Sequence, residues 1–164
     1  SIDLVSKRII SWLSNHQLTY ENSKEEYRLN FDYIIQKQTN HLLNEIKNSK
    51  ELENKLVGCA AIILTGLTYQ DNKNYLNNGL SILKKIIKSS IDNYGFPKSR
   101  NIKQLCLYLK YFIIIREWFK ESQNDVPEYI DETIYYLGLS YAFIWQNIKQ
   151  DLFFNGNYIS NNEE

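Results

Sequence analysis

Residues 72–101 read NKNYLNNGLSILKKIIKSSIDNYGFPKSRN, a helical pattern followed by an abrupt break. In the first part, apolar residues recur at spacings of four, three and four, at Leu76, Leu80, Leu83 and Ile87. That period places them on one face of an α-helix, so the pattern predicts a helix over residues 72–91. Gly95 and Pro97 then end the helix. The chain has only six Gly and two Pro, so Gly95 and Pro97 together indicate a specific change of backbone direction.

The same period predicts five further helices, over about residues 3–15, 23–48, 50–67, 102–122 and 127–148. Ser23 and Glu26 have the spacing of an N-terminal capping box, and Pro127 suits a first helical turn. We expect the following residues of the first, second, third, fifth and sixth helices to face inward: Leu4, Ile9, Trp12, Leu13; Tyr27, Phe31, Ile34, Ile35, Gln38, Leu42; Leu52, Leu56, Cys59, Ile63, Leu67; Ile102, Leu105, Leu109, Phe112, Ile113; Ile130, Ile134, Leu137, Tyr141, Ile144 and Ile148.

Six helices joined by short connections predict an all-α fold of three antiparallel hairpins in a single domain over residues 1–164. The third helix carries Gly58, Ala60, Ala61 and Gly66, which leave it slim enough for a neighbour to approach closely. The hairpins recur at about 45–50 residues, which favours a curved α/α array or part of a ring. The segment Phe153 to Gly156 reads as a turn that ends the last helix.

Composition narrows the classes of function. Charge is balanced at 19 basic and 19 acidic residues, which argues against a general nucleic-acid or membrane-surface binder. No apolar run reaches the ~20 residues that cross a bilayer, so we expect no membrane insertion. Cys59 and Cys106 fall at apolar helical positions and are expected to be free buried thiols. The sequence shows no motif for a metal or cofactor, and we expect none.

The two histidines have simple structural interpretations. His16 ends the first predicted helix, where a cation is favoured by the helix dipole. His41 lies inside the second, where a hydrogen-bonded residue between helices is the more common role and a ligand the rarer one.

Local charge is less even than the total. Six basic residues and one acidic residue, Asp92, lie between Lys84 and Lys103, an excess of 6 − 1 = +5. Five acidic residues and no basic one lie between Glu121 and Glu132. Both runs can be solvated helix surface. The alternative is that the basic run, with Lys98 and Arg100 on a loop held by rigid helices, binds a ligand.

Aromatic residues gather around the same break, at Tyr94, Phe96, Tyr108, Tyr111 and Trp118. In a helical protein most such rings belong to the core. Where some of them line a cleft with Arg, Lys and Asn, they suit an acidic sugar, because rings stack on pyranose faces and cations pair with carboxylate or sulfate.

The chain resembles, over nearly its whole length, the helical N-terminal region of heparinase II/III-like polysaccharide lyases. The likeness rests on the order and spacing of several short motifs. These are SKRIISWL at residues 6–13, QTNHL at 38–42, AIILTGL at 61–67, GL at 79–80, GFPKSRN at 95–101 and FNG at 154–156. The loop motif is similar to the family's Asp-Gly-Gly-x-x-x-Arg-Ser/Asn substrate loop.

This resemblance implies an (α/α) toroid followed by a C-terminal β-sandwich, so the chain is expected to be a fragment of a longer protein. It implies binding of a uronate-containing polysaccharide, with cleavage by β-elimination, in a periplasmic or envelope setting. Tyr94, Lys98, Arg100 and Asn101 would bind substrate. Asn54 and Gln104 would stand at catalytic positions.

Two departures weaken the catalytic part of the resemblance. Pro97 stands where many active members carry His, and Gln104 or a neighbour stands where they carry Tyr. Glycan binding therefore carries over better than lyase activity. The alternative hypothesis is a non-catalytic helical scaffold that binds a protein partner through an exposed apolar groove.

Overall fold

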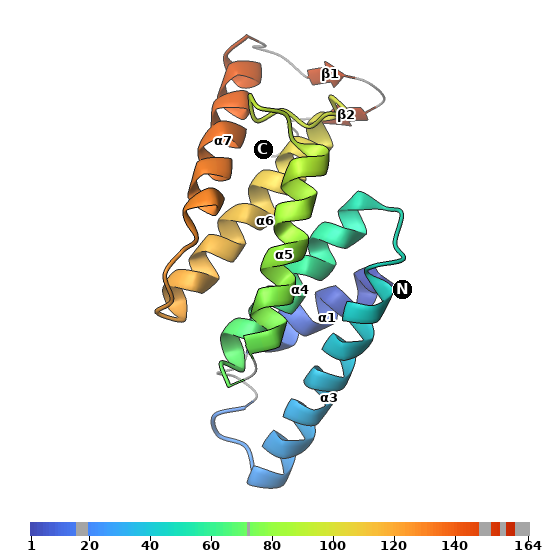
Figure 1. Ribbon diagram of the computed structural model, residues 1–164, viewed down its shortest axis with the longest axis vertical. Coiled ribbons are helices and arrows are strands. Elements are labelled where there is room, and N and C mark those ends of the chain that lie inside the picture. Colours follow the sequence, from blue (N-terminus) through green and yellow to red (C-terminus); the bar gives the residue numbers. More distant parts are fainter. Residues whose placement is uncertain (16–19, 72, 148–151, 155–156, 160–164) are drawn as a thin grey trace.

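The protein is described by a computed structural model that covers residues 1–15, 20–71, 73–147, 152–154 and 157–159. These residues form six α-helices and one antiparallel β-hairpin, so the predicted all-α class is confirmed (Figure 1). The elements are α1 (Ile2–Ser14), α3 (Glu25–Glu45), α4 (Leu52–Thr68), α5 (Lys73–Ser90), α6 (Ile102–Glu121), α7 (Glu128–Asn147), β1 (Leu152–Phe154) and β2 (Asn157–Ile159).

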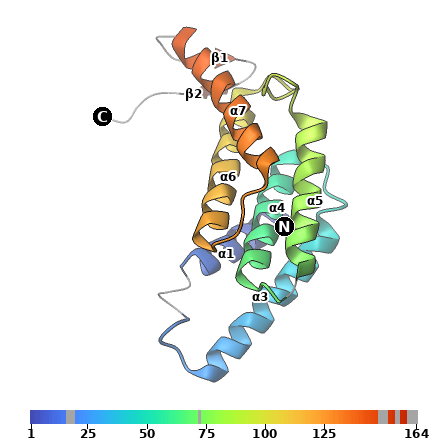
Figure 2. The ribbon, with the colours of Figure 1, turned by 60° about the vertical axis from the view of Figure 1, so that its left-hand side comes forward.

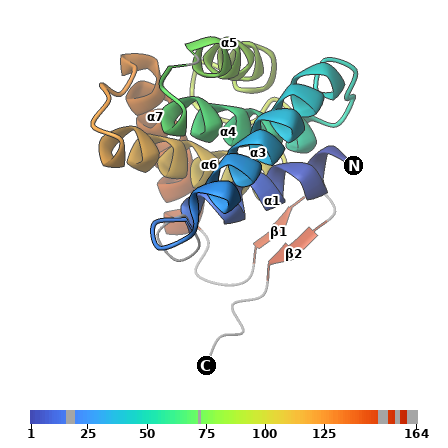
Figure 3. The same ribbon diagram turned by 90° about the horizontal axis from the view of Figure 1, so that it is seen from below.

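Helix α4 is the centre of the molecule. Its twelve consecutive residues from Leu56 to Leu67 are all buried, and a helix that is apolar all round must be covered on every side. The cover comes from α1, α3, α5 and α6, which all pack against it. Figure 3 looks along the molecule from below and shows these helices arranged around α4.

Glycine lets α4 and α5 approach closely. A Cβ atom added at Gly66 would lie 2.4 Å from the backbone nitrogen of Leu76, and one added at Gly79 would lie 2.6 Å from the Ile63 side chain. About one turn before Ile63 on α4, the Cys59 thiol donates to the Gly79 carbonyl oxygen at 3.0 Å. The expectation that the third predicted helix is slim and closely approached is therefore confirmed.

Neighbouring helices pair as α4 with α5 and α6 with α7, each pair running antiparallel (Figures 1 and 2). Helix α1 packs on both α3 and α4. Buried polar groups join these layers. The Thr39 and Thr65 hydroxyls hydrogen-bond at 3.1 Å between α3 and α4, and Tyr69 donates to Asp32 at 2.7 Å where α4 ends.

Several details of the sequence prediction are wrong. Ser23 does not cap α3, which begins at Glu25 with Lys24 at the N-cap, and the Ser23 hydroxyl donates instead to the Tyr20 carbonyl. Some residues expected to face inward are exposed, because no described neighbour covers the outer sides of their helices. They are Leu4, Trp12, Tyr27, Ile34, Ile113 and Tyr141. Ile148, and Asn155 with Gly156 of the expected turn, lie outside the described residues.

We predict opposite effects on stability for two Gly→Ala substitutions. Gly66→Ala should destabilise the fold by about 1–3 kcal/mol, because its Cβ would overlap the backbone of α5. Gly138→Ala is the matched control. Its Cβ would meet nothing within 4 Å, so the higher helix propensity of Ala should stabilise the fold by up to about 1 kcal/mol. Urea unfolding measures both, and equal effects would contradict the close approach of α4 and α5.

Candidate functional site

The connection between α5 and α6 is a tightly hydrogen-bonded loop over residues 91–101. Ile91 and Pro97 form an antiparallel bridge, and the Lys98 amide donates to the Ser90 carbonyl at 2.8 Å. The Arg100 amide closes a turn on the Pro97 carbonyl at 2.8 Å. Arg100 has a φ of +57°, a left-handed conformation that is uncommon outside Gly and Asn. The local hydrogen bonds therefore hold Arg100 in one backbone geometry.

Asp92 organises this loop. One carboxylate oxygen accepts from the backbone amides of Tyr94 at 3.0 Å and Phe96 at 2.9 Å, and the other pairs with the Arg100 guanidinium at 2.7 Å. Burial on its own raises the pKa of Asp92. The two amide hydrogen bonds and the Arg100 cation outweigh burial, so the pKa lies below its usual value. Asp92 is therefore a fixed anion at neutral pH.

Helix α7 holds the other side of the loop. The Ser140 hydroxyl, itself buried, donates to the Tyr94 carbonyl at 2.9 Å. Gly95 has a φ of +82°, and a Cβ there would lie 2.4 Å from the Tyr136 backbone. Only glycine satisfies both the left-handed conformation and this close contact. The loop is thus fixed to α5, α6 and α7 at once.

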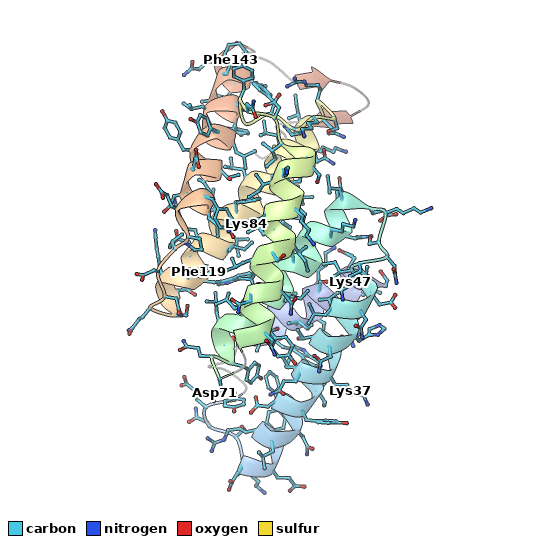
Figure 4. All side chains as sticks on the ribbon, in the orientation of Figure 1. Lys37, Lys47, Asp71, Lys84, Phe119 and Phe143 are labelled. Carbon is cyan, nitrogen blue, oxygen red and sulfur yellow. The ribbon has the colours of Figure 1, made fainter. Side chains whose placement is uncertain are left out.

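A cavity of about 460 Å³, which we call the loop groove, lies between this loop, the start of α6 and the end of α7. Its size is within the range of small-molecule sites. Arg100 and Asn101 supply its polar lining, while Phe96, Pro97 and Phe143 are among its apolar residues. Figure 4 shows Phe143 at the end of α7 beside the loop. The groove thus combines aromatic surface with one cation and one amide.

The four predicted substrate-binding residues share the loop but have different roles. The Arg100 side chain lines the loop groove and is 60% exposed, although Asp92 holds one of its nitrogens. Asn101 also lines the groove, and its side-chain oxygen caps α6 by accepting from the Lys103 amide at 2.9 Å. Lys98 donates to the Lys88 carbonyl at the end of α5, and Tyr94 is 78% exposed at the tip of the loop. Lys98 and Tyr94 do not line the groove.

The two predicted catalytic residues are not in the groove lining. Asn54 lies in the first turn of α4, where its amide nitrogen donates to the Glu51 carboxylate. Gln104 lies in the first turn of α6 and accepts from the Ser99 hydroxyl at 2.5 Å. Gln104 therefore stabilises the loop through its hydrogen bond with Ser99. Asn54 lies at the start of a different helix, α4.

Six of the described tyrosines have raised pKa values. Burial is the main cause that raises the pKa of Tyr69, Tyr75, Tyr108, Tyr111 and Tyr129, the last to about 12. A hydrogen bond to Asp32 raises the pKa of Tyr20 in the same direction. A tyrosine base needs a lowered pKa, so the raised pKa values do not suit these six phenols to the role of a base.

The basic and acidic runs of the sequence meet across a second groove. This α5–α7 groove has a volume of about 490 Å³ and is lined by Lys84 and Lys88 from the basic run and by Glu132 from the acidic run. The Lys84 ammonium lies 4.8 Å from the centre of the Tyr129 ring. Part of the basic run and part of the acidic run therefore line one groove, which the sequence could not show.

Two important residues were missed from the sequence. Asp92 had been counted only as the one negative charge of the basic run, yet it organises the loop. Its position three residues before Gly95 is a signal for a side chain that caps a turn. Phe143 lay in the last predicted helix with no local signal, because only the pairing of α6 with α7 brings it to the groove.

Other expectations concern metals, thiols and membranes. Among the described residues, no group of three or more His, Cys, Asp or Glu side chains could hold a metal ion. His16 lies outside the described residues, and His41 is exposed on α3, contrary to the expected contact between helices. Cys59 is fully buried and Cys106 half-buried. No helix in the described part of the chain is both long and apolar enough to span a bilayer.

Comparison with known proteins gives no family model, no curated protein and no solved structure that matches this chain.

We predict that Asp92→Ala destabilises the protein by about 2 kcal/mol at neutral pH, because the Tyr94 and Phe96 amides and the Arg100 guanidinium lose their acceptor. Since folding lowers the pKa of Asp92, its contribution is present above the unfolded pKa of about 3.9 and is lost as pH falls through the folded value. The stability gap between wild type and variant should therefore narrow in acid. Urea unfolding between pH 7 and the acid limit of folding measures it.

Asp131→Ala is the control for this prediction. Asp131 is exposed and 3.9 Å from Arg116, so its loss should change stability by less than about 0.5 kcal/mol. A gap for Asp92→Ala that stays constant with pH would contradict the role of the Asp92 carboxylate.

Proposed function

We propose that this chain is the helical domain of a heparinase II/III-like protein and that its loop groove binds an acidic, uronate-containing polysaccharide. In this proposal the helical hairpins belong to an (α/α) toroid, and a C-terminal β-sandwich of the same protein completes the binding cleft. The observation that carries the proposal is the joint lining of one groove by Arg100, Asn101 and two phenylalanine rings.

The chemistry of the groove suits a sugar acid. Phe96 and Phe143 offer aromatic faces for the C–H surface of a pyranose ring. Arg100 keeps donors beyond the one that Asp92 holds, and a guanidinium with five N–H groups can pair with a second carboxylate. Asp92 and the contacts to α7 fix the loop before any ligand arrives, which lowers the entropic cost of binding.

Lyase activity is the less supported part of the proposal. Pro97 in the loop cannot act as a base, and the described tyrosines with shifted pKa values are less acidic than usual. Asn54 and Gln104 remain the candidates for neutralising the substrate carboxyl group, provided that substrate binding or the β-sandwich brings them to it. Binding is therefore proposed first and cleavage second.

We predict that oligogalacturonides bind to the wild-type chain and bind at least about tenfold more weakly to Lys98→Ala/Arg100→Ala, because the charge-assisted contacts are lost. Arg100→Ala alone should account for most of the loss, since Lys98 does not line the groove. Isothermal titration calorimetry measures the dissociation constants. Arg116→Ala/Lys120→Ala removes the same charge at the far end of α6 and should leave binding unchanged. Unchanged binding to the Lys98/Arg100 variant would refute the proposal.

A separate prediction concerns cleavage by the intact protein. If it is a lyase, uronate polymers should yield an unsaturated uronyl product that absorbs in the ultraviolet. Asn54→Ala and Gln104→Ala should then lower the rate of product formation by about a hundredfold or more, while oligosaccharide binding persists. Absence of the product with several uronate polymers would refute lyase activity, and the binding proposal would still stand.

A protein-binding scaffold is the second candidate, and the outer face of α7 favours it. This face exposes Tyr135, Leu139, Phe143 and Trp145, and exposed large apolar side chains that lie together can mark a protein-interaction site. Leu139→Lys separates the two candidates because Leu139 is not in the groove lining. It should leave glycan binding unchanged under the first candidate and weaken association with a partner domain under the second.

A further inference from the structure

We propose that a separate groove between the end of α3, the start of α4 and the second half of α5 binds a phosphate or sulfate ester. We call it the lysine groove, and its volume is about 430 Å³. It does not depend on the function proposed above. One face of α5, with Lys85, lines the lysine groove, and another face, with Lys84 and Lys88, lines the α5–α7 groove.

Three lysines from three different elements surround this groove. Lys47 follows the end of α3, Lys55 lies in the second turn of α4, and Lys85 lies in α5. Figure 4 labels Lys47 near the end of α3. Only the folded chain brings these residues, far apart in sequence, to one concavity.

The charge of these lysines is not compensated at the groove. No Asp or Glu is among the residues that line it, and none of the three lysines forms an ion pair within the described residues. Glu51, whose carboxylate accepts from Asn54, precedes α4 nearby in the chain but does not line the groove. Three like charges around a concavity repel one another, and an anion between them relieves that repulsion.

The type of cation indicates the type of anion. A lysine ammonium is a compact point charge on a flexible stem, whereas arginine offers a planar fork that matches a carboxylate. Three ammonium groups on flexible stems around one groove suit a tetrahedral anion with three or more oxygens, which is a phosphate or a sulfate. This differs from the loop groove, where Arg100 is the cation.

The floor of the groove indicates that the anion is carried on a larger body. Leu52 and Ile82 are half-buried, and they line the groove beside Ile46 and Ile86, which are almost fully buried. Apolar surface of this kind gains nothing from an inorganic ion but is favoured when it covers a ring or an alkyl group. The geometry therefore fits an ester in which an apolar or ring-shaped body lies on the floor and its anionic group faces the lysines.

Isothermal titration calorimetry at fixed ionic strength tests the proposal with inorganic phosphate, sulfate, phenyl phosphate and phenyl sulfate. Phenyl esters should bind several-fold more tightly than the inorganic ions because of the apolar floor. Comparison of the dissociation constants of phenyl phosphate and phenyl sulfate identifies which ester the groove prefers. Binding of either ester supports the site. Failure of all four probes to bind would overturn it.

Lys47→Ala/Lys85→Ala should weaken binding of the preferred phenyl ester by about tenfold or more. Lys84→Ala/Lys88→Ala is the matched control, because it removes two charges from the neighbouring face of α5 and should change the dissociation constant by less than about twofold. Equal weakening in both variants would show general electrostatic attraction and overturn the site. The test is independent of uronate binding, since Arg100 and the loop groove are unchanged in both variants.

Discussion

The close contact between α4 and α5 is the constraint on which the other features depend. Gly66 lies against the backbone of Leu76, and Gly79 lies against Ile63, so the two helices meet with almost no side chain between them at these points. Because α4 is buried on all sides, its position fixes α1, α3 and α6 as well as α5. Every groove described above is bounded by α5 or by the loop that follows it.

Helix α5 therefore divides the surface into regions of different chemistry. The face toward α7 carries Lys84 and Lys88, which are opposed by Glu132. The face toward α3 and α4 carries Lys85, which has no acidic residue in its groove. Charges that are neighbours in the sequence thus act in separate sites. The +5 excess of the run from Lys84 to Lys103 does not form one basic patch.

Much of the fold could be predicted from the sequence, because helical periodicity and Gly or Pro breaks are local signals. The helices, the slim third helix and the loop with Arg100 and Asn101 were all found in this way. Periodicity shows which face of a helix is apolar but not whether a neighbour covers it. For that reason Leu4 and Tyr27 were wrongly placed inside. Phe143 and Lys47 reach their grooves only through tertiary packing, which no local pattern encodes.

The two proposed sites differ in how far their cations are neutralised, and this difference predicts what each can select. Asp92 already pairs with one nitrogen of Arg100, so a ligand carboxylate at the loop groove shares this cation with Asp92. Such a site favours ligands that add ring stacking on Phe96 and Phe143 to a single carboxylate. The lysine groove has no such internal partner, and an anion there is attracted by all three cations. Its affinity should therefore depend strongly on salt, whereas the loop groove should discriminate mainly by the shape of the sugar.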